Sequence, residues 1–169
     1  SQHETGGKMQ NIDVLAVGDT VTDTFIRLPD GQAHTYSNEQ GSWLAMPFGA
    51  KIPFEFAEVV RADGNAANAA ISFARLGLNS ALMTNVGGDR EGRDIIDALH
   101  TYDVDTRFIR INPGKASNHN YILWYKEERT ILTRHEDYKY HWPHLHPHEV
   151  PKWIYFSSVS NNALVFHDA

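Results

Sequence analysis

Three short apolar runs are spread along the chain, and each ends in glycine or in polar residues. The first is IDVLAV at residues 12–17, the second is ALMTNV at 81–86, and the third is WIYF at 153–156. Nearly continuous apolar runs of this length are typical of parallel strands that are covered on both faces. The pattern predicts a buried parallel sheet whose strands end in turns that a ligand can reach.

The strongest helix signal lies in residues 61–78, which read RADGNAANAAISFARLGL. Gly64 allows a backbone to approach a ligand closely, Asn65 is a predicted N-cap, and Gly77 closes the helix. The alanines keep one side narrow, so the helix can lie close to a sheet. Asn68 places an amide in the first turn, where it holds a polar ligand or, in the alternative interpretation, only caps the helix with Asn65.

A second helix is predicted to begin after Asp89 and to run to Leu99. Glu91 in its first turn suits the helix dipole. The preceding GGDREG segment at residues 87–92 lacks the Gly-Lys-Ser/Thr end of a phosphate loop and the glycine spacing of a dinucleotide fingerprint. We therefore interpret it as a structural turn.

The stretch 24–60 has no helical period and contains several short β-like runs. Residues 120–125 and 129–133 form a predicted β-hairpin, because aromatic and β-branched residues dominate both arms. The long stretch also carries aromatic residues that fit a dimer surface and a small local core equally well. These are Trp43, Phe48, Phe54 and Phe56.

Composition narrows the class of protein. The chain has 169 residues, 41% of them hydrophobic, which is enough for one sizeable core. A formal net charge of -6 with no Lys/Arg-rich run argues against nucleic acid or an anionic membrane as partner. Zero cysteines exclude disulfides and thiolate metal sites, and no apolar run reaches the ~18 residues of a membrane span. We expect a cytoplasmic protein whose residues 1–10 form a disordered leader.

The stretch 135–150 is rich in histidine, so a zinc or nickel site has to be considered. Pro143 and Pro147 break any helix that would place histidine pairs on one face. We expect a solvated connection with no specific metal site. The histidines are His135, His141, His144, His146 and His148.

Four motifs occur in one order: VGDTVTD at 17–23, GNAANAAISFARLG at 64–77, NVGGDREGRDI at 85–95 and ERTIL at 128–132. Together they resemble the ribokinase-like (PfkB) family of carbohydrate and nucleoside kinases. The resemblance runs from residue 11 to residue 169 and covers about the first half of a family member. The Asp-Thr-x-Gly-Ala-Gly-Asp segment that marks the catalytic end of the family is absent.

The resemblance implies an α/β fold with a Rossmann-like partial sheet flanked by helices and a small β lid. The lid would be formed by segments at about 24–60 and 116–134. In the family, these strands cover the sugar and often pair two subunits, so a homodimer through the lid is expected. The family's Gly-Asp-x-x-Gly segment is structural, in agreement with our interpretation of residues 87–92.

The resemblance also implies a function, namely ATP-dependent phosphorylation of a sugar or nucleoside hydroxyl. This chain would supply the sugar-binding and lid half, with substrate-binding residues Asp23, Gly64, Asn65, Asn68 and Asn120. Catalytic and cofactor-binding residues are expected in none of its positions. ATP and Mg²⁺ would serve the full-length parent, and the fragment alone would be inactive. The alternative is a non-catalytic sugar-binding or dimerisation module on the same half-fold.

One position departs from the family pattern, because Asp63 stands where family members usually carry a glycine. An acidic side chain there favours a neutral sugar or nucleoside over an anionic substrate. Further polar residues are available for the same pocket, while Asp19 is expected only to stabilise a turn. These additional candidates are Ser117, Asn118, Ser158 and Ser160.

Overall fold

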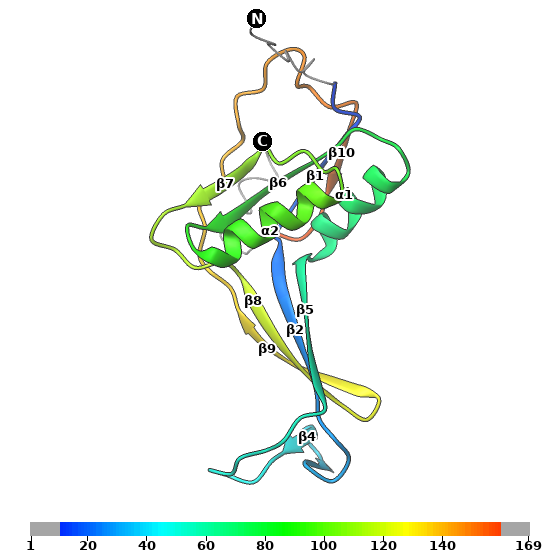
Figure 1. Cartoon of the computed structure of the whole chain (residues 1–169), viewed down its shortest axis with the longest axis vertical. Coiled ribbons are helices and arrows are strands. Elements are labelled where there is room, and N and C mark those ends of the chain that lie inside the picture. The colour runs from blue at the N-terminus through cyan, green and yellow to red at the C-terminus, as the bar shows by residue number, and fades with distance from the viewer. Residues whose placement is uncertain (1–10, 160–169) are drawn as a thin grey trace, which may run out of the picture.

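The computed structural model describes residues 11–159 and contains a four-stranded parallel sheet (Figure 1). Its strand order is β10-β1-β6-β7. The strands are β1 (Val14–Val17), β6 (Ser80–Gly87), β7 (Ile109–Asn112) and β10 (Trp153–Phe156). The three apolar runs therefore form strands as predicted. The predicted leader at 1–10 lies outside the described residues.

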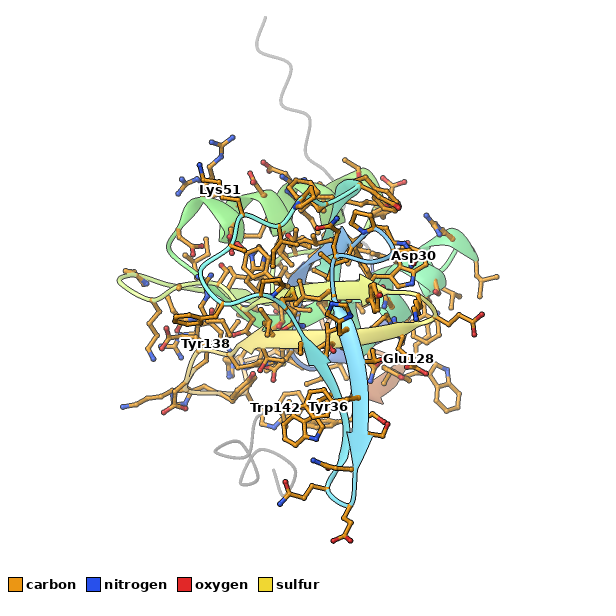
Figure 2. The ribbon with its side chains drawn as sticks, turned by 90° about the horizontal axis from the view of Figure 1, so that it is seen from below. Asp30, Tyr36, Lys51, Glu128, Tyr138 and Trp142 are labelled. Atoms are coloured by element: carbon orange, nitrogen blue, oxygen red, sulfur yellow. The ribbon has the colours of Figure 1, made fainter. Side chains whose placement is uncertain are left out.

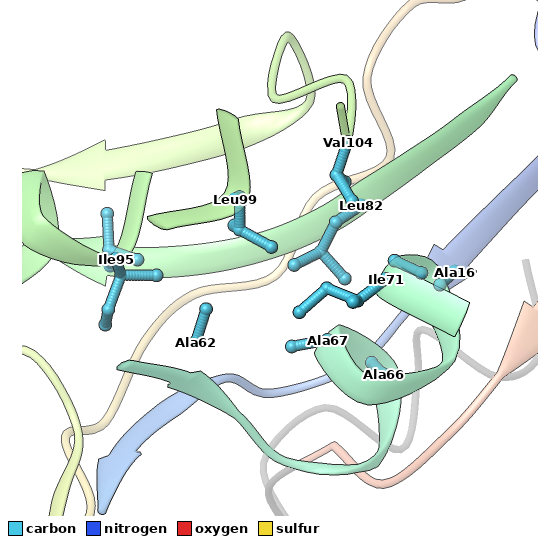
Figure 3. Packing of buried hydrophobic residues seen from close by; sticks show 11 residues of the cluster. Ala16, Ala62, Ala66, Ala67, Ile71, Leu82, Ile95, Leu99 and Val104 are labelled. Carbon is cyan, nitrogen blue, oxygen red and sulfur yellow. The ribbon is translucent and has the colours of Figure 1, made fainter. Parts of the chain in front are cut away.

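Two helices, α1 (Asn65–Arg75) and α2 (Arg90–Thr101), cover one face of this sheet (Figure 1). Figure 3 shows the core between them, where Ile95 and Leu99 of α2 pack with Leu82 of β6. Buried alanines on α1 allow that helix to lie close to the strands. They are Ala66, Ala67 and Ala70.

The start of α1 corrects one expectation. The N-cap is Gly64, no side chain caps the helix, and Asn65 is already its first residue. The Asn68 side chain donates to Asp63, so neither asparagine caps the helix. The capping interpretation of these two residues is wrong, because the amide of Asn68 has a carboxylate partner outside the helix.

A second, four-stranded sheet extends away from the helical layer (Figure 1). Its strands are β2 (Val21–Arg27), β5 (Phe56–Asp63), β8 (His119–Tyr125) and β9 (Glu128–Arg134), in the order β5-β2-β8-β9. β2 runs parallel to β8 and antiparallel to β5, while β8 and β9 form the predicted hairpin. The chain thus has an α/β fold with a separate β layer.

A two-stranded arm, β3 (His34–Asn38) and β4 (Gly41–Ala45), lies at the far end of the second sheet (Figure 1). Leu28, Ala33 and Tyr125 form the small core beside it. The four aromatic residues of the stretch 24–60 do not belong to that core. Each is exposed to solvent, and the relative exposure of Phe48 is 107%. The local-core interpretation of Trp43, Phe48, Phe54 and Phe56 is therefore wrong.

The opposite face of the parallel sheet is covered by a segment that we call the connector (residues 135–152). Tyr140 and Trp142 of the connector pack on Leu15 and Met83 of the sheet. The connector leads into β10 at the sheet edge, where Trp153 is 76% exposed. We expected β10 to be buried, which is wrong because its position at the edge leaves one side without a neighbouring strand in the described chain.

The GGDREG segment joins the two sheets. Asp89 caps α2 by accepting from the Gly92 N–H at 2.8 Å, and it also accepts from the Ser117 N–H at 2.8 Å and the Ser117 hydroxyl at 2.7 Å. Glu91 in the first turn of α2 meets His119 of β8 at 2.9 Å. The segment is the structural turn that was predicted. No helix of residues 11–159 has the length and apolar character to cross a bilayer.

Candidate functional site

A hollow of about 240 Å³ lies where β1 ends and α1 begins, beside β8 of the second sheet. Three of the predicted substrate-binding residues line it, namely Gly64, Asn65 and Asn120. The carboxyl end of a strand and the amino end of a helix both present polar backbone groups, so this is where an α/β sheet binds polar ligands. The other lining residues are Asp19, Thr20, Val21, His135, Ser157 and Ser158.

Two glycines lie where β1, α1 and the turn after β10 meet, and one of them, Gly64, lines the hollow. Gly64 has a φ of +98°, and a Cβ built there would lie 3.0 Å from the Asp19 carbonyl oxygen. A Cβ on Gly18, at the end of β1, would lie 2.9 Å from the Ser158 carbonyl oxygen and 3.0 Å from the Ala66 Cβ. Strand, helix and the turn after β10 therefore meet with no space for another side chain.

Asp23 and Asn120 face each other across the hydrogen-bonded strands β2 and β8. They are register partners, and the Asn120 amide donates to Asp23 at 3.0 Å. The carbonyl oxygen of Asn120 is buried and has no hydrogen-bond partner in the described part of the chain. An unsatisfied acceptor on a residue that lines the hollow suits a ligand that brings a hydroxyl donor.

Asp63 links Asp23 to the amino end of α1. One of its carboxylate oxygens accepts from the Gly64 N–H and from the Asn68 amide, both at 2.7 Å. Its other neighbour is the carboxyl group of Asp23. The pKa of Asp23 is raised, first by burial and then by the charge and hydrogen bond of Asp63, while the amide of Asn120 acts in the opposite direction. Asp23, Asp63, Asn68 and Asn120 thus form one connected polar group.

A β-bulge helps to place Asp63. Val21 pairs with Asp63 and Asp23 pairs with Val60, so β5 contains one more residue than β2 between these pairs. Ala62 within this bulge has a φ of +56°, which is uncommon for a residue with a side chain. Bulges re-aim side chains, and this one brings the Asp63 carboxylate towards Asp23.

The remaining sequence candidates have other roles. Ser117 donates to Asp89 through its N–H and its hydroxyl. The side-chain oxygen Oδ1 of Asn118 accepts from the Glu136 N–H at 2.8 Å. Both are buried structural residues, so the expectation that they face the substrate is wrong. Ser158 lines the hollow, whereas Ser160 lies outside the described residues.

Sequence reasoning missed several residues of the site. Asp63 was noticed only as a departure from a family pattern, and its central position between Asp23 and Asn68 depends on the bulge. His135 lines the hollow but was grouped with the histidine-rich stretch. His119 holds β2 and α2 in place next to the site, since its ring lies 3.0 Å from the Thr24 hydroxyl of β2 and 2.9 Å from Glu91 of α2.

Within residues 11–159 there is no group of three or more His, Cys, Asp or Glu side chains arranged to hold a metal ion. The donor set of the hollow is better suited to hydroxyl groups, because its carboxylates and amides accept and donate in pairs. We therefore assign no step to a metal at this site.

The fold and the hollow define a class of protein, namely an α/β domain with a polar hollow at the strand ends and a projecting β layer beside it. Residues 56–162 match the pfkB family of carbohydrate kinases. This match covers more than half of the chain, and the chain belongs to this family. The resemblance found in the sequence motifs is thereby confirmed.

Solved structures support the same fold. A protein of Agrobacterium tumefaciens assigned as a ribokinase is 28% identical, with a TM-score of 0.57, covering 74% of this chain and 36% of the other. Arabidopsis thaliana ribokinase, solved with ribose and ATP, is 19% identical with a TM-score of 0.56, covering 75% and 36%. Cryptococcus neoformans ribokinase, solved with ADP, is 22% identical with a TM-score of 0.54, covering 73% and 34%. At these two lower identities the likeness shows the fold alone.

The chain thus spans little more than a third of the length of these relatives. No curated protein matches it significantly. The predicted α/β, ribokinase-like fold class is confirmed by these neighbours.

Proposed function

We propose that this chain is the sugar-binding and lid half of an ATP-dependent carbohydrate kinase. The observation that carries the proposal is the connected polar group of Asp23, Asp63, Asn68 and Asn120, of which Asn120 lines the hollow. Membership of the pfkB family supplies the reaction class. The parent protein would transfer a phosphoryl group from ATP to a hydroxyl of a sugar or nucleoside.

In this proposal the chain's own residues bind and orient the substrate. Ring hydroxyls donate to the Asp23 carboxylate and to the unsatisfied carbonyl oxygen of Asn120, and Asn65 contacts the substrate at the amino end of α1. The second sheet acts as the lid and keeps water away from the reacting hydroxyl. ATP with Mg²⁺ supplies the phosphoryl group in the parent, and the residues for them lie beyond this chain.

The substrate class follows from charge. Asp63 places a second carboxylate beside Asp23, and no lysine or arginine lines the hollow among the described residues. An anionic substrate would meet two negative groups at short range without a compensating cation. We therefore propose a neutral sugar or a nucleoside.

Calorimetric titration tests this assignment on the 169-residue chain. Ribose, a hexose and adenosine serve as neutral probes, and gluconate and ribose 5-phosphate serve as anionic ones. We expect one neutral probe to bind and both anionic probes to fail. Asn68→Ala should weaken that binding by about tenfold, since it removes the amide that holds Asp63 in place. The chain alone should transfer no phosphoryl group from ATP to any probe.

Asp97→Asn provides the control, because Asp97 is an exposed residue of α2 outside the hollow. It should leave the affinity unchanged. The hollow is not the sugar site if all the neutral probes fail to bind. The same holds if Asn68→Ala binds a neutral probe as tightly as the unsubstituted 169-residue chain does. Sugar phosphorylation by the isolated chain would contradict the proposed division between the two halves.

The alternative, a dimerisation module, is favoured by one observation on the β3–β4 arm. Tyr36 and Trp43 stack at 6.4 Å on its exposed surface, and neither strand contains a charged Lys, Arg, Asp or Glu. Figure 2 shows Tyr36 on this arm, viewed from below. Sheet edges that stay unpaired usually carry charges, so an uncharged edge with exposed aromatics suits pairing with a second copy. We propose a homodimer through this arm, in a cytoplasmic parent protein.

A further inference from the structure

A second cavity, also of about 240 Å³, lies on the opposite face of the parallel sheet from the helices. It lies between the connector and strands β6 and β7 and is open on one side. None of its lining residues belongs to the hollow described above. They are Val17, Met83, Thr84, Asn85, Arg107, Phe108, Ile109, Arg110, Tyr140, His141, Trp142 and Pro143.

The floor of this cavity is set by strand alternation. Met83 packs in the cluster on the connector face, so Asn85, two residues later on β6, points to the same face. Arg110 of β7 is the register partner of Asn85. Phe108 packs in that cluster too, and Arg110 follows it by two residues. The sheet therefore presents an amide and a guanidinium side by side.

The polar groups of the cavity are donors. Arg107 is held by Asp105, with its Nε 2.8 Å from a carboxylate oxygen, and by Glu149 at 3.4 Å. Arg110 makes no side-chain hydrogen bond or ion pair with any residue between 11 and 159. The Asn85 carbonyl oxygen already accepts from Asn112 at 3.1 Å, which leaves its NH₂ group to donate.

Within the described residues no carboxylate lines this cavity. A guanidinium, an amide NH₂ and the His141 imidazole together favour an anion with more than one acceptor oxygen. The charge of Arg107 is neutralised by Asp105 and Glu149, so its side chain forms part of the cavity wall and adds little net positive charge.

The walls are flat and apolar. Phe108, Tyr140 and Trp142 supply aromatic rings, and Val17 and Met83 supply aliphatic contacts. Aromatic walls close to a cation select a planar ring that carries negative charge. A volume of about 240 Å³ accommodates a single ring with one anionic group.

We propose that this cavity is a binding site for a small aromatic anion, a carboxylate or a phosphate monoester on one planar ring. The anionic group lies against Arg110 and Asn85, and the ring lies between Trp142 and Phe108. Because the connector forms one wall, the occupied site fastens the connector to the sheet. The site does not depend on the sugar hollow, since the two share no residue.

Thermal unfolding and calorimetry with the 169-residue chain test the proposal with four probes. Benzoate and phenyl phosphate carry both features, inorganic phosphate lacks the ring, and benzyl alcohol lacks the charge. We expect at least one of the first two to bind and raise Tm, and the last two to be without effect. Arg110→Gln should weaken that binding by about tenfold, because it keeps the side-chain stem and removes the charge.

Arg93→Gln is the matched control, since Arg93 is exposed on α2 and no ion pair or hydrogen bond involves its side chain in residues 11–159. Arg93→Gln should bind the probes with the same affinity as the unsubstituted 169-residue chain. Trp142→Leu should weaken phenyl phosphate and benzoate alike. Equal affinity for inorganic phosphate would indicate a nonspecific anion site and overturn the proposal. Absence of binding by both aromatic anions, or an equal loss in Arg93→Gln and Arg110→Gln, would do the same.

Discussion

Asp23 and Asp63 hold two carboxyl groups next to each other at the end of the parallel sheet, although like charges repel. The fold accepts this because Asn68, the Gly64 N–H and Asn120 donate to the pair. Sequence spacing predicted a polar site after the first strand, but Asp23 was singled out only by family resemblance. Which asparagine faces the ligand depends on partners that lie far apart in the chain. Sequence spacing alone therefore gave the wrong role to Asn118, and wrong capping roles to Asn65 and Asn68.

The raised pKa of Asp23 gives a stability prediction. The folded chain binds this proton more tightly than the unfolded chain, so stability falls as pH rises from the ordinary value of 3.8 through the folded pKa. At pH 7 the variant Asp23→Asn should be more stable than the parent by about 1 kcal/mol, or about 3 °C in Tm. The gain should shrink as pH approaches 3.8, and sugar affinity should be lost.

Thermal unfolding between pH 4 and pH 8 measures this effect. Asp97→Asn removes an exposed charge of α2 and should show no such pH trend. A variant Asp23→Asn that is less stable than the parent at pH 7 would mean that the charge of Asp23 is stabilising, contrary to the geometry.

At the scale of elements, α2 is the piece that fixes the second sheet to the helical layer. Its first-turn residue Glu91 contacts His119 of β8, and its capping residue Asp89 contacts Ser117, two residues before that strand. Strands β1, β6 and β10, both helices and the β8–β9 hairpin were predictable, because apolar runs and turn residues are local signals. The exposure of β10 was not, because an edge position is a property of strand order and has no local signal.

Removal of the cap should be costly for this reason. Burial raises the pKa of Asp89, but its hydrogen bonds with Ser117 and Gly92 outweigh burial and leave the pKa lowered. Its contribution to stability is therefore complete above the ordinary value of 3.8 and is lost as pH falls through the folded pKa. At pH 7, Asp89→Ala should lower the free energy of unfolding by about 2–3 kcal/mol.

Urea denaturation at pH 7 tests this prediction. Asp97→Ala, an exposed substitution in the same helix, should change the free energy of unfolding by less than about 0.5 kcal/mol. Equal effects of the two substitutions would show that Asp89 contributes only as a generic surface charge and does not join the sheets.

At the scale of the whole molecule, the described chain is two four-stranded sheets and a projecting two-stranded arm that exposes Tyr36 and Trp43. The β3–β4 arm pairs with no other strand of residues 11–159, and Phe48 and Phe54 beside it are exposed. The sequence left two uses of these aromatics open; their exposure removes the local-core interpretation, and the dimer surface stays a prediction. Exposure is set by how the arm folds away from the body, which no local pattern encodes.

Sedimentation equilibrium tests the proposed dimer. We expect the parent chain to be dimeric at micromolar concentration, and Trp43→Ser with Phe48→Ser to raise the dimer dissociation constant by about a hundredfold, since both are large aromatic contacts. Trp153→Ser changes an exposed tryptophan on β10 instead and serves as the matched control. A dimer that survives the arm variant but dissociates in the β10 variant would place the interface at the sheet edge.

The two glycines at the junction of β1, α1 and the turn after β10 have a consequence for how such a protein can change over generations. No side chain larger than hydrogen fits at Gly18 or Gly64 without moving the backbone of Asp19 or Ser158. The base of the pocket is therefore fixed in shape, and drift there is selected against by folding itself. New ligand preferences, whether natural or engineered, have to arise at lining positions outside this junction, such as His135, because Asn120 is itself bonded to Asp23.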